Sequence, residues 1–189
     1  MQRYKLIALF GPSGAGKDTL LNYITNAYPA QFHKVVSYTT RMKREGEKEG
    51  EDYYFISPED FTNRVLQGTM LEATEWGGEF YGSDISAFNP DKINIEVLDE
   101  RGIECLIDHP DIELYPIFIA IEPKARLIRV LNREENPDCE KICKRFLEDS
   151  VRFNKEFDFH YNLFYNGNGI QLSTFEDALE NLGLLSKNA

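Results

Sequence analysis

Residues 11 to 19 read Gly11-Pro12-Ser13-Gly14-Ala15-Gly16-Lys17-Asp18-Thr19, and this stretch decides the fold. It directly follows the apolar run 6–10 and precedes residues 20–24, whose composition is typical of a helix. A strand, a glycine-rich turn and a helix start are the context of a phosphate-binding loop, because the unpaired amides of a helix N-terminus converge on an anion. The stretch predicts that the chain binds a nucleoside triphosphate.

The residue types in this loop suit a phosphate group. Glycine carries no Cβ, so its backbone can adopt positive φ and its N–H groups can close around phosphate oxygens. A lysine adds a compact positive charge near the β and γ phosphates. A plain glycine turn that caps a helix is the alternative interpretation. The predicted ATP-binding residues are Gly11, Ser13, Gly14, Ala15, Gly16, Lys17, Asp18 and Thr19.

The position after the lysine departs from the usual pattern, in which Ser or Thr follows the lysine directly. Here Asp18 comes first and Thr19 second, an arrangement that resembles the Lys-x-Thr of several small nucleotide kinases. We therefore predict that Thr19 is the hydroxyl near a magnesium ion. Asp18 either holds a metal-bound water or stabilises the positive end of the helix dipole.

The composition limits the class of protein. The 189 residues suit one compact domain with lobes, and 42% hydrophobic residues are enough for a core. No apolar run approaches the roughly 20 residues of a membrane span and the N-terminus lacks a signal-peptide pattern, so we expect a cytoplasmic protein without a membrane partner. The net charge of −11 argues against nucleic acid as a partner. Cys105, Cys139 and Cys143 match no metal-ligand pattern, so we expect reduced thiols.

Apolar runs recur at residues 4–10, 93–98, 115–121 and 159–165, and segments of helical spacing separate them. Short, strongly apolar strands that alternate with helices imply a parallel sheet covered on both faces. We therefore predict an α/β fold with the parallel sheet core of P-loop NTPases, flanked by helices.

Between residues 35 and 90 the pattern changes to brief strand-like pieces at 35–37, 53–56 and 80–81. A helix is predicted after Ser57, because a serine cap, a proline in the first turn and two acidic residues follow one another there. This segment predicts a separate small lobe with both strands and a helix.

The charged stretch 123–157 predicts two helices joined by a turn near Asn136-Pro137, because proline removes a backbone donor and breaks helical regularity. Near the C-terminus, Ser173 and Glu176 predict a capping box for a last helix. The resulting division is a core of residues 1–34, 91–122 and 158–189, a small lobe of residues 35–90, and a helical segment of residues 123–157.

Residues 37–55 contain a second group of anion-binding side chains. Arg41 and Arg44 are three residues apart, and each guanidinium can donate paired hydrogen bonds to a phosphate. Ser37 and Tyr53 add neutral hydroxyls. A solvated charged loop is the alternative for a segment of this composition. Together the four side chains predict a site for a monophosphate.

This segment closely resembles the nucleoside-monophosphate lobe of guanylate kinases, whose pattern runs Ser-x-Thr-Thr-Arg-x-x-Arg-x-Gly-Glu-x-x-Gly-x-Asp-Tyr-x-Phe. Residues 37–55 fill every fixed position of that pattern, and the resemblance continues at Glu72 and at Tyr81-Gly82-Ser83. It implies that Glu72 accepts hydrogen bonds from guanine N1 and the exocyclic amine, that Ser83 contacts the base, and that Tyr81 contacts the phosphate. The GMP-binding residues implied in this way are Ser37, Arg41, Arg44, Tyr53, Glu72, Tyr81, Ser83 and Asp99.

The resemblance implies that residues 35–90 are a nucleoside-monophosphate-binding lobe and that residues 123–157 are a helical lid. It spans nearly the whole chain, although the last thirty residues match only in outline. It implies that Arg133 and Arg145 close over the triphosphate and neutralise charge on the group in transfer. Arg129 is a further candidate in the same segment. The implied catalytic residues are Lys17, Arg41, Arg133 and Arg145.

The chain departs from the family at residues 97–102. Guanylate kinases commonly have Asp-x-Asp followed shortly by Gly, whereas Val97 stands here at the first acid and Asp99 at the second. Glu96 is adjacent, but strand alternation predicts that its side chain points to the opposite face. Asp18 could compensate for the missing acid from the phosphate loop, which is a hypothesis.

The resemblance implies a guanylate kinase, which transfers a phosphoryl group from ATP to GMP or dGMP with Mg2+ and gives GDP or dGDP and ADP. A kinase of ribose 1,5-bisphosphate is one alternative, since such relatives share the Lys-Asp-Thr variant. A non-catalytic interaction module is another, although such modules typically lose the phosphate loop. The sequence does not decide between GMP and dGMP, or between a monomer and a homodimer.

Overall fold

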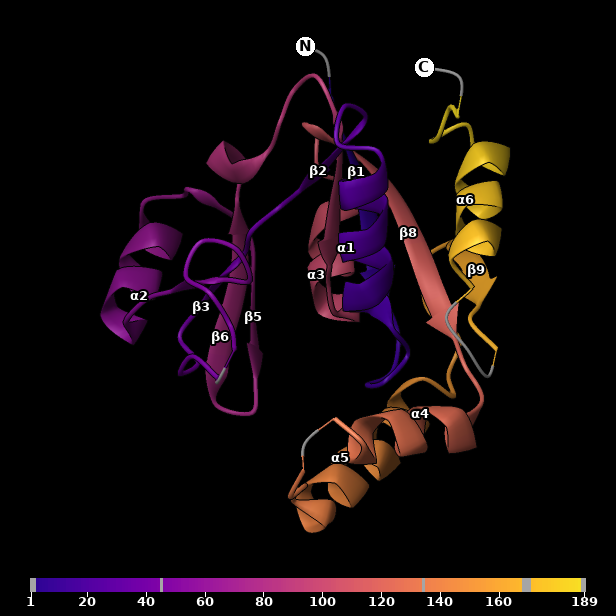
Figure 1. Cartoon of the computed structure of the whole chain (residues 1–189). Coiled ribbons are helices and arrows are strands. Elements are labelled where there is room, and N and C mark those ends of the chain that lie inside the picture. The colour runs from indigo at the N-terminus through magenta and orange to yellow at the C-terminus, as the bar shows by residue number, and fades with distance from the viewer. Residues whose placement is uncertain (1–2, 45, 134, 168–170, 188–189) are drawn as a thin grey trace.

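The computed structural model describes residues 3–44, 46–133, 135–167 and 171–187. Glu45 of the arginine-bearing segment and Glu134 of the lid lie outside the described residues. Figure 1 shows the arrangement: a central sheet with its helices, a lobe that carries α2 on one side, and α4 and α5 below the sheet.

The central sheet is parallel throughout, with strand order β2-β7-β1-β8-β9. The strand β1 lies in the middle of this sheet and pairs with β7 on one side and with β8 on the other, so strands that are far apart in sequence are neighbours in space. The predicted α/β core is confirmed. The strands are β1 (Tyr4–Phe10), β2 (Phe32–Lys34), β7 (Ile93–Val97), β8 (Ile112–Ala120) and β9 (Asn162–Tyr165).

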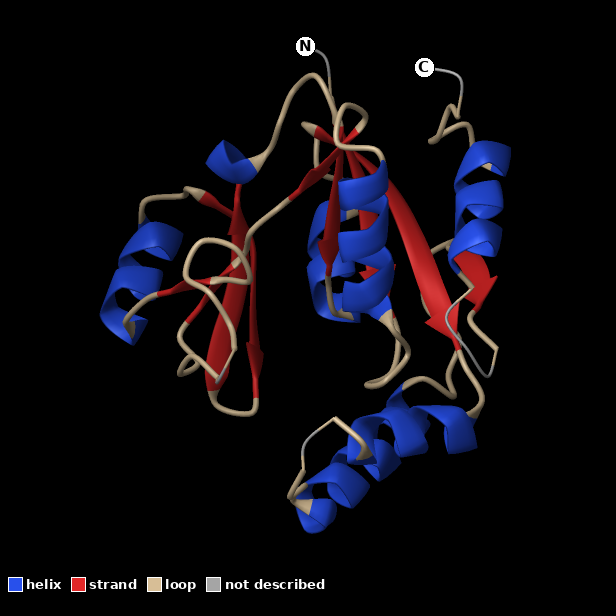
Figure 2. Cartoon of the chain, in the orientation of Figure 1, coloured by secondary structure: helices blue, strands red, loops and turns tan. Residues whose placement is uncertain are grey.

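Helices cover both faces of this sheet (Figure 2). Along β1, Ile7 and Leu9 face a core cluster that contains residues of α1 and α6, whereas Leu6 and Phe10 face a second cluster with residues of α3. Alternate side chains of one strand therefore enter opposite cores, which is why the run is apolar throughout. The helices are α1 (Lys17–Ala27), α3 (Glu100–Leu106) and α6 (Leu172–Asn181).

The lobe is a second sheet with strand order β4-β3-β6-β5. The Ser57 hydroxyl accepts a hydrogen bond from the Asp60 amide at 3.0 Å, as the sequence predicted for the cap of α2. The long strand β5 was not predicted. The elements are β3 (Tyr38–Thr39), β4 (Tyr54–Phe55), α2 (Pro58–Leu66), β5 (Met70–Trp76), β6 (Glu79–Asp84) and a 3-10 turn (Ile85–Ala87).

The lid consists of α4 (Pro123–Leu131) and α5 (Cys139–Arg152), which confirms two helices with a break between them. The Arg126 guanidinium on α4 joins them, since it donates to the Phe146 carbonyl at 3.0 Å and to the Ser150 hydroxyl at 2.7 Å. Asp138 caps α5 by accepting from the Lys141 amide at 3.0 Å.

Two local predictions were wrong. Residues 35–37 are not a strand, because β2 ends at Lys34 in the central sheet and β3 begins at Tyr38 in the lobe, so these residues connect the two sheets. The capping box also does not form, because α6 already begins at Leu172 and Glu176 instead accepts a hydrogen bond from the Tyr23 hydroxyl of α1. Among the described residues, no helix combines the length and apolar character needed to cross a bilayer.

Candidate functional site

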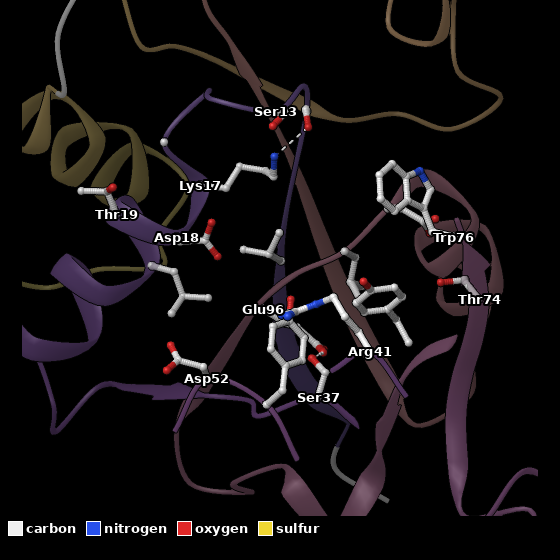
Figure 3. A pocket seen from close by; sticks show the side chains of 18 of the residues that line it. Ser13, Lys17, Asp18, Thr19, Ser37, Arg41, Asp52, Thr74, Trp76 and Glu96 are labelled. Carbon is white, nitrogen blue, oxygen red and sulfur yellow. Dashed lines mark hydrogen bonds between the residues drawn. The ribbon is translucent and has the colours of Figure 1, made fainter. Parts of the chain in front are cut away.

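A cavity of about 480 Å³ lies where the three parts of the chain meet. The phosphate loop and the carboxyl end of β7 form one wall, the lobe forms another, and the lid supplies arginines. Figure 3 shows Lys17 and Asp18 on one side of this space and Ser37, Arg41 and Glu96 on another. Segments that are far apart in sequence thus contribute polar side chains to a single cavity.

The phosphate loop has the backbone that its glycines predicted. Gly11, Gly14 and Gly16 have φ of 139°, 81° and 92°, which disfavours any residue with a Cβ. The Lys17 ammonium donates to the carbonyls of Gly11 at 2.8 Å and Pro12 at 3.1 Å, so it folds back over the loop. Burial lowers the pKa of Lys17 to about 8.

A carboxylate of the lid accepts a hydrogen bond from one backbone amide of this loop. The Ser13 amide donates to Asp149 Oδ2 at 2.7 Å, across 136 residues of sequence. The same oxygen lies 3.3 Å from the Arg126 guanidinium, and both side chains are buried. The lid is therefore attached to the phosphate loop through an ion pair that the sequence gave no reason to expect.

The arginines of the lobe are held in place by their own motif. Arg41 forms a two-point ion pair with Glu47, with nitrogen–oxygen distances of 2.7 and 3.0 Å, and its guanidinium lies 5.5 Å from the centre of the Tyr53 ring. The Arg44 amide donates to the same carboxylate at 2.8 Å. The rings of Tyr53 and Tyr81 meet edge to face at 6.1 Å. All four predicted phosphate ligands line the cavity: Arg41, Arg44, Tyr53 and Tyr81.

Two buried carboxyl groups stand behind these ligands. Glu72 on β5 lines the cavity, and its Oε1 lies 3.0 Å from the Ser83 hydroxyl. That hydroxyl also contacts Glu96 Oε1, which accepts from the Ser37 hydroxyl at 2.5 Å. Burial raises the pKa of both acids, and the neighbouring acid raises that of Glu72 further. Ser83 is fully buried between the two acids and lies outside the cavity lining.

Asp99 lines the cavity, but its carboxylate already forms a hydrogen bond and ion pairs with other groups of the chain. It caps α3 by accepting from the Gly102 amide at 2.9 Å, and it lies 3.2 Å from the guanidinium groups of Arg101 and Arg152. Val97 lines the cavity at the position where the family commonly has an acid, so the first carboxylate is absent from this wall.

The lid places both of its predicted arginines on the cavity. Arg133 is exposed, whereas Arg145 lies 4.3 Å from the centre of the Trp76 ring in the lobe. The Nε atom of Arg145 is buried without a hydrogen-bond partner among the described residues, and burial lowers the pKa of the side chain. Arg129 instead donates to the carbonyls of Gly14 at 3.3 Å and Ala15 at 3.4 Å, so it supports the loop.

Two oxygen donors lie at the start of α1. Asp18 and Thr19 are both exposed and both line the cavity. In Figure 3 the Asp18 carboxylate points into the cavity. Among the described residues, no group of three or more His, Cys, Asp or Glu side chains could hold a metal ion.

Among the side chains at this site that sequence reasoning missed are Glu96, Asp149 and Arg152. Alternation along β7 had directed Glu96 away from the site, and nothing local marks Asp149 or Arg152 on a charged helix. The signal for Glu96 was available, because a carboxylate in the middle of the apolar run Ile93–Val97 has to be paired or functional when it is buried.

Comparisons with known proteins agree on one family. The family model described as Guanylate kinase matches residues 3–183. A curated guanylate kinase of Prochlorococcus marinus (strain MIT 9312) is 36% identical over 161 residues, which cover 82% of this chain and 86% of the relative. A second, from Malacoplasma penetrans (strain HF-2), is 32% identical over 162 residues, which cover 82% of this chain and 83% of the relative.

A solved structure supports the fold independently. The crystal structure of a guanylate kinase from Anaplasma phagocytophilum matches with a TM-score of 0.64 over 98% of this chain and 88% of that chain. The sequence identity is 20%, so this likeness concerns the arrangement of the helices and strands.

Proposed function

This chain belongs to the guanylate kinase family, and on that premise we propose that its cavity binds ATP at the phosphate loop and GMP at the lobe at the same time. The enzyme is a nucleoside monophosphate kinase, which transfers the γ-phosphoryl group of ATP to GMP and gives ADP and GDP. The division of labour among its residues, set out below, is our proposal.

One observation carries this assignment of roles: two anion-binding groups of different construction line one cavity. Backbone amides and Lys17 make up the first, and the guanidinium of Arg41 with the hydroxyls of Tyr53 and Tyr81 makes up the second. Phosphoryl transfer needs little covalent chemistry from a protein, because positioning and charge neutralisation supply most of the catalysis. Two anion sites that share a cavity meet that need.

Each side chain has a task that follows from its chemistry. Lys17 would leave the loop carbonyls and bind the β and γ phosphates, which restores the charge that burial disfavours. Arg133 and Arg145 would neutralise charge on the moving group from the lid side. Arg41 and Arg44 would hold the acceptor phosphate, with Glu47 fixing both through its carboxylate.

The base would bind against Glu72. An ionised Glu72 can accept hydrogen bonds from N1–H and the exocyclic amine of guanine, and adenine would leave this buried carboxylate unpaired at a cost of about 1–3 kcal/mol. Ser37 lines the cavity near the base. Ser83, which does not line the cavity, would orient the Glu72 carboxylate through its hydroxyl. Asp99 would complete the base site beside Glu72, on the α3 side of the cavity.

Magnesium is the cofactor that we propose. Mg2+ is commonly held by one or two protein oxygen atoms, several waters and the substrate phosphates. Asp18 and Thr19 supply oxygen donors beside Lys17, and the direction of its carboxylate favours Asp18 as the residue that would hold a metal-bound water. The bound ion would neutralise negative charge on the phosphates during transfer.

The comparisons favour this function over a kinase of ribose 1,5-bisphosphate and over a non-catalytic module. Activity on dGMP, a monomeric or homodimeric state, a cytoplasmic location and the lack of a nucleic-acid or membrane partner stay predictions.

A coupled assay of ADP release tests the function. We expect the enzyme with ATP and Mg2+ to phosphorylate GMP and dGMP, and to act poorly on AMP, UMP and ribose 1,5-bisphosphate. Glu72→Gln should lower kcat/KM for GMP by about 30-fold or more, since one oxygen acceptor becomes an amide donor. A preference for AMP, or unchanged GMP kinetics in Glu72→Gln, would contradict the proposed role of Glu72.

A further inference from the structure

The cavity contains a carboxyl group that the proposed mechanism does not use. Glu96, near the end of β7, lines the cavity although its side chain is almost fully buried, at 1% exposure. Its Oε1 accepts from the Ser37 hydroxyl at 2.5 Å and also contacts the Ser83 hydroxyl. Its Oε2 is buried without a hydrogen-bond partner among the described residues. A buried oxygen of this kind calls for a partner, and a ligand in the cavity can supply it.

The hydrogen bonds around Ser83 require a proton on one of its two neighbours. Ser83 Oγ lies 3.0 Å from Glu72 Oε1 and within hydrogen-bonding distance of Glu96 Oε1. A hydroxyl carries one proton, so it can donate to only one of the two carboxyl groups. The other carboxyl group must donate to the hydroxyl. Glu72 and Glu96 therefore share one proton through Ser83.

The surroundings of the pair favour this state. Among the described residues, no lysine or arginine forms an ion pair with Glu72 or Glu96, and burial raises the pKa of Glu96 to about 7. Other titratable groups near the pair are Asp99 and Cys105, which lie near Glu72, and Tyr53, which lies near Glu96. Asp99 has its own counter-charges in Arg101 and Arg152, so it does not supply a cation to the pair.

A shared proton gives the base site two complementary forms. Guanine presents an acceptor at O6, a donor at N1 and a donor amine at position 2. It fits when the shared proton leaves the contact with Ser83 and lies on Glu96 Oε2, which donates to O6, while Ser83 donates to ionised Glu72, which also accepts from N1 and the amine. The base 2,6-diaminopurine presents a donor amine at position 6, an acceptor at N1 and a donor amine at position 2. It fits when the proton lies on Glu72 and is donated to N1, while Ser83 donates to ionised Glu96, whose Oε2 accepts from the 6-amine.

We propose that Glu96 is a second base-reading residue and that this enzyme also phosphorylates the nucleoside monophosphate of 2,6-diaminopurine. The proposal rests on the proposed function, because it places the same edge of the base against Glu72. The phosphoryl transfer is unchanged, and the switch between the two bases gains and loses no proton. One proton moves from one carboxyl group to the other. Adenine lacks the 2-amine, so AMP remains a poor acceptor.

The test compares GMP, the 2,6-diaminopurine ribonucleoside monophosphate and AMP as acceptors at saturating ATP. We expect wild-type kcat/KM for the diaminopurine nucleotide to be within about tenfold of that for GMP. Glu96→Leu should lower kcat/KM for both acceptors by about tenfold or more, through KM rather than kcat, because it removes the donor for O6 of guanine and the acceptor for the 6-amine of diaminopurine. Glu148→Gln, which removes an exposed charge on α5, should leave both values unchanged.

A second variant and a pH series separate this role from a merely structural one. Glu96→Gln keeps the volume of the side chain and an N–H that can donate to O6 of guanine, but it removes the ionised acceptor for the 6-amine and the shared proton. It should therefore lower kcat/KM for the diaminopurine nucleotide by about tenfold or more relative to GMP. In the wild type, KM for both acceptors should rise as the pH passes about 7, because the pair then loses its proton. In Glu96→Leu, KM for GMP should not change over the same range.

The outcomes are distinguishable. A wild type that phosphorylates GMP but not the diaminopurine nucleotide overturns this proposal and leaves the proposed function standing. Unchanged kcat/KM for both acceptors in Glu96→Leu, or an unchanged ratio of the two acceptors in Glu96→Gln, also overturns it. No turnover of either acceptor by the wild type would overturn the proposed function, and this inference with it.

Discussion

Replacement of Asp149 tests whether the lid is attached to the phosphate loop as the structure indicates. Asp149 on α5 and Arg126 on α4 are 6% and 4% exposed, and their charged atoms lie 3.3 Å apart. The same carboxylate oxygen accepts from the Ser13 amide at 2.7 Å. A variant without this carboxylate leaves a buried cation without its counter-charge, and a smaller side chain also leaves a loop amide without an acceptor.

The contacts set the size of the effect. Removal of one partner from a buried ion pair costs about 3–5 kcal/mol. Arg126 keeps the Phe146 carbonyl and the Ser150 hydroxyl as acceptors at 3.0 and 2.7 Å, which reduces the loss. We therefore expect Asp149→Asn, whose amide oxygen still accepts from Ser13, to lower the free energy of unfolding by about 2–3 kcal/mol. Asp149→Ala should cost about 1–2 kcal/mol more, because the Ser13 amide also loses its acceptor.

Urea unfolding measures both values, with the fluorescence of the single tryptophan as the signal. That residue, Trp76, lies 4.3 Å from the Arg145 guanidinium on α5, so it reports on the lid as well as on the lobe. Asp108→Asn, which removes an exposed charge, is the control and should change stability by less than about 0.5 kcal/mol.

Saturating ATP adds a second readout. A phosphate oxygen can replace the lost acceptor of Ser13, so the difference between Asp149→Ala and Asp149→Asn should become smaller when the nucleotide is bound. If both variants unfold within about 0.5 kcal/mol of the wild type, the carboxylate does not hold the lid on the loop and the reasoning is refuted.

Two further predictions concern stability. Gly14→Ala should lower the free energy of unfolding by about 1–3 kcal/mol more than Gly77→Ala. Both glycines have positive φ, but only a Cβ at residue 14 would clash, since it would lie 2.7 Å from the Arg126 carbonyl oxygen. Equal losses of the two variants in thermal and urea unfolding would contradict this. The raised pKa of Glu96 means that the folded state binds its proton more tightly, so its contribution to stability is complete below pH 4.5 and is lost as the pH rises through about 7. Glu96→Gln should therefore gain up to about 3 kcal/mol relative to the wild type between pH 4.5 and 7, whereas a pH-independent difference would speak against a buried titrating acid.

The sequence was sufficient wherever local chemistry determines local structure. The glycines of the phosphate loop adopt positive φ and Ser57 caps α2, because the residues that determine these conformations are neighbours in the chain. The failed capping box shows the limit of such reasoning. Glu176 had a suitable spacing from Ser173, but the Tyr23 hydroxyl of α1 engages it from a helix that is remote in sequence.

Contacts between distant segments could not be predicted in this way. The Asp149 carboxylate reaches the Ser13 amide only because α5 folds back over the loop, and no spacing within residues 139–152 indicates that one acid of the helix is buried. The same holds for Arg152, which reaches Asp99 and Glu100 at the start of α3. A single sequence marks these side chains only as members of a charged helix.

The prediction that the Glu96 side chain points away from the site was wrong for a different reason. Alternation along β7 was correct, since Ile95 and Val97 pack with the cluster of α1 while Leu98 packs with the cluster of α3. The error was to assign the site to one face of the sheet. The lobe lies beside the carboxyl end of β7, so side chains from both faces of this strand line the cavity, and Val97 and Glu96 do so together. Residue 97 therefore lacks the acid, but the adjacent Glu96 brings a carboxyl group into the same cavity, on the side of Glu72 and Ser83, where we propose that the base binds.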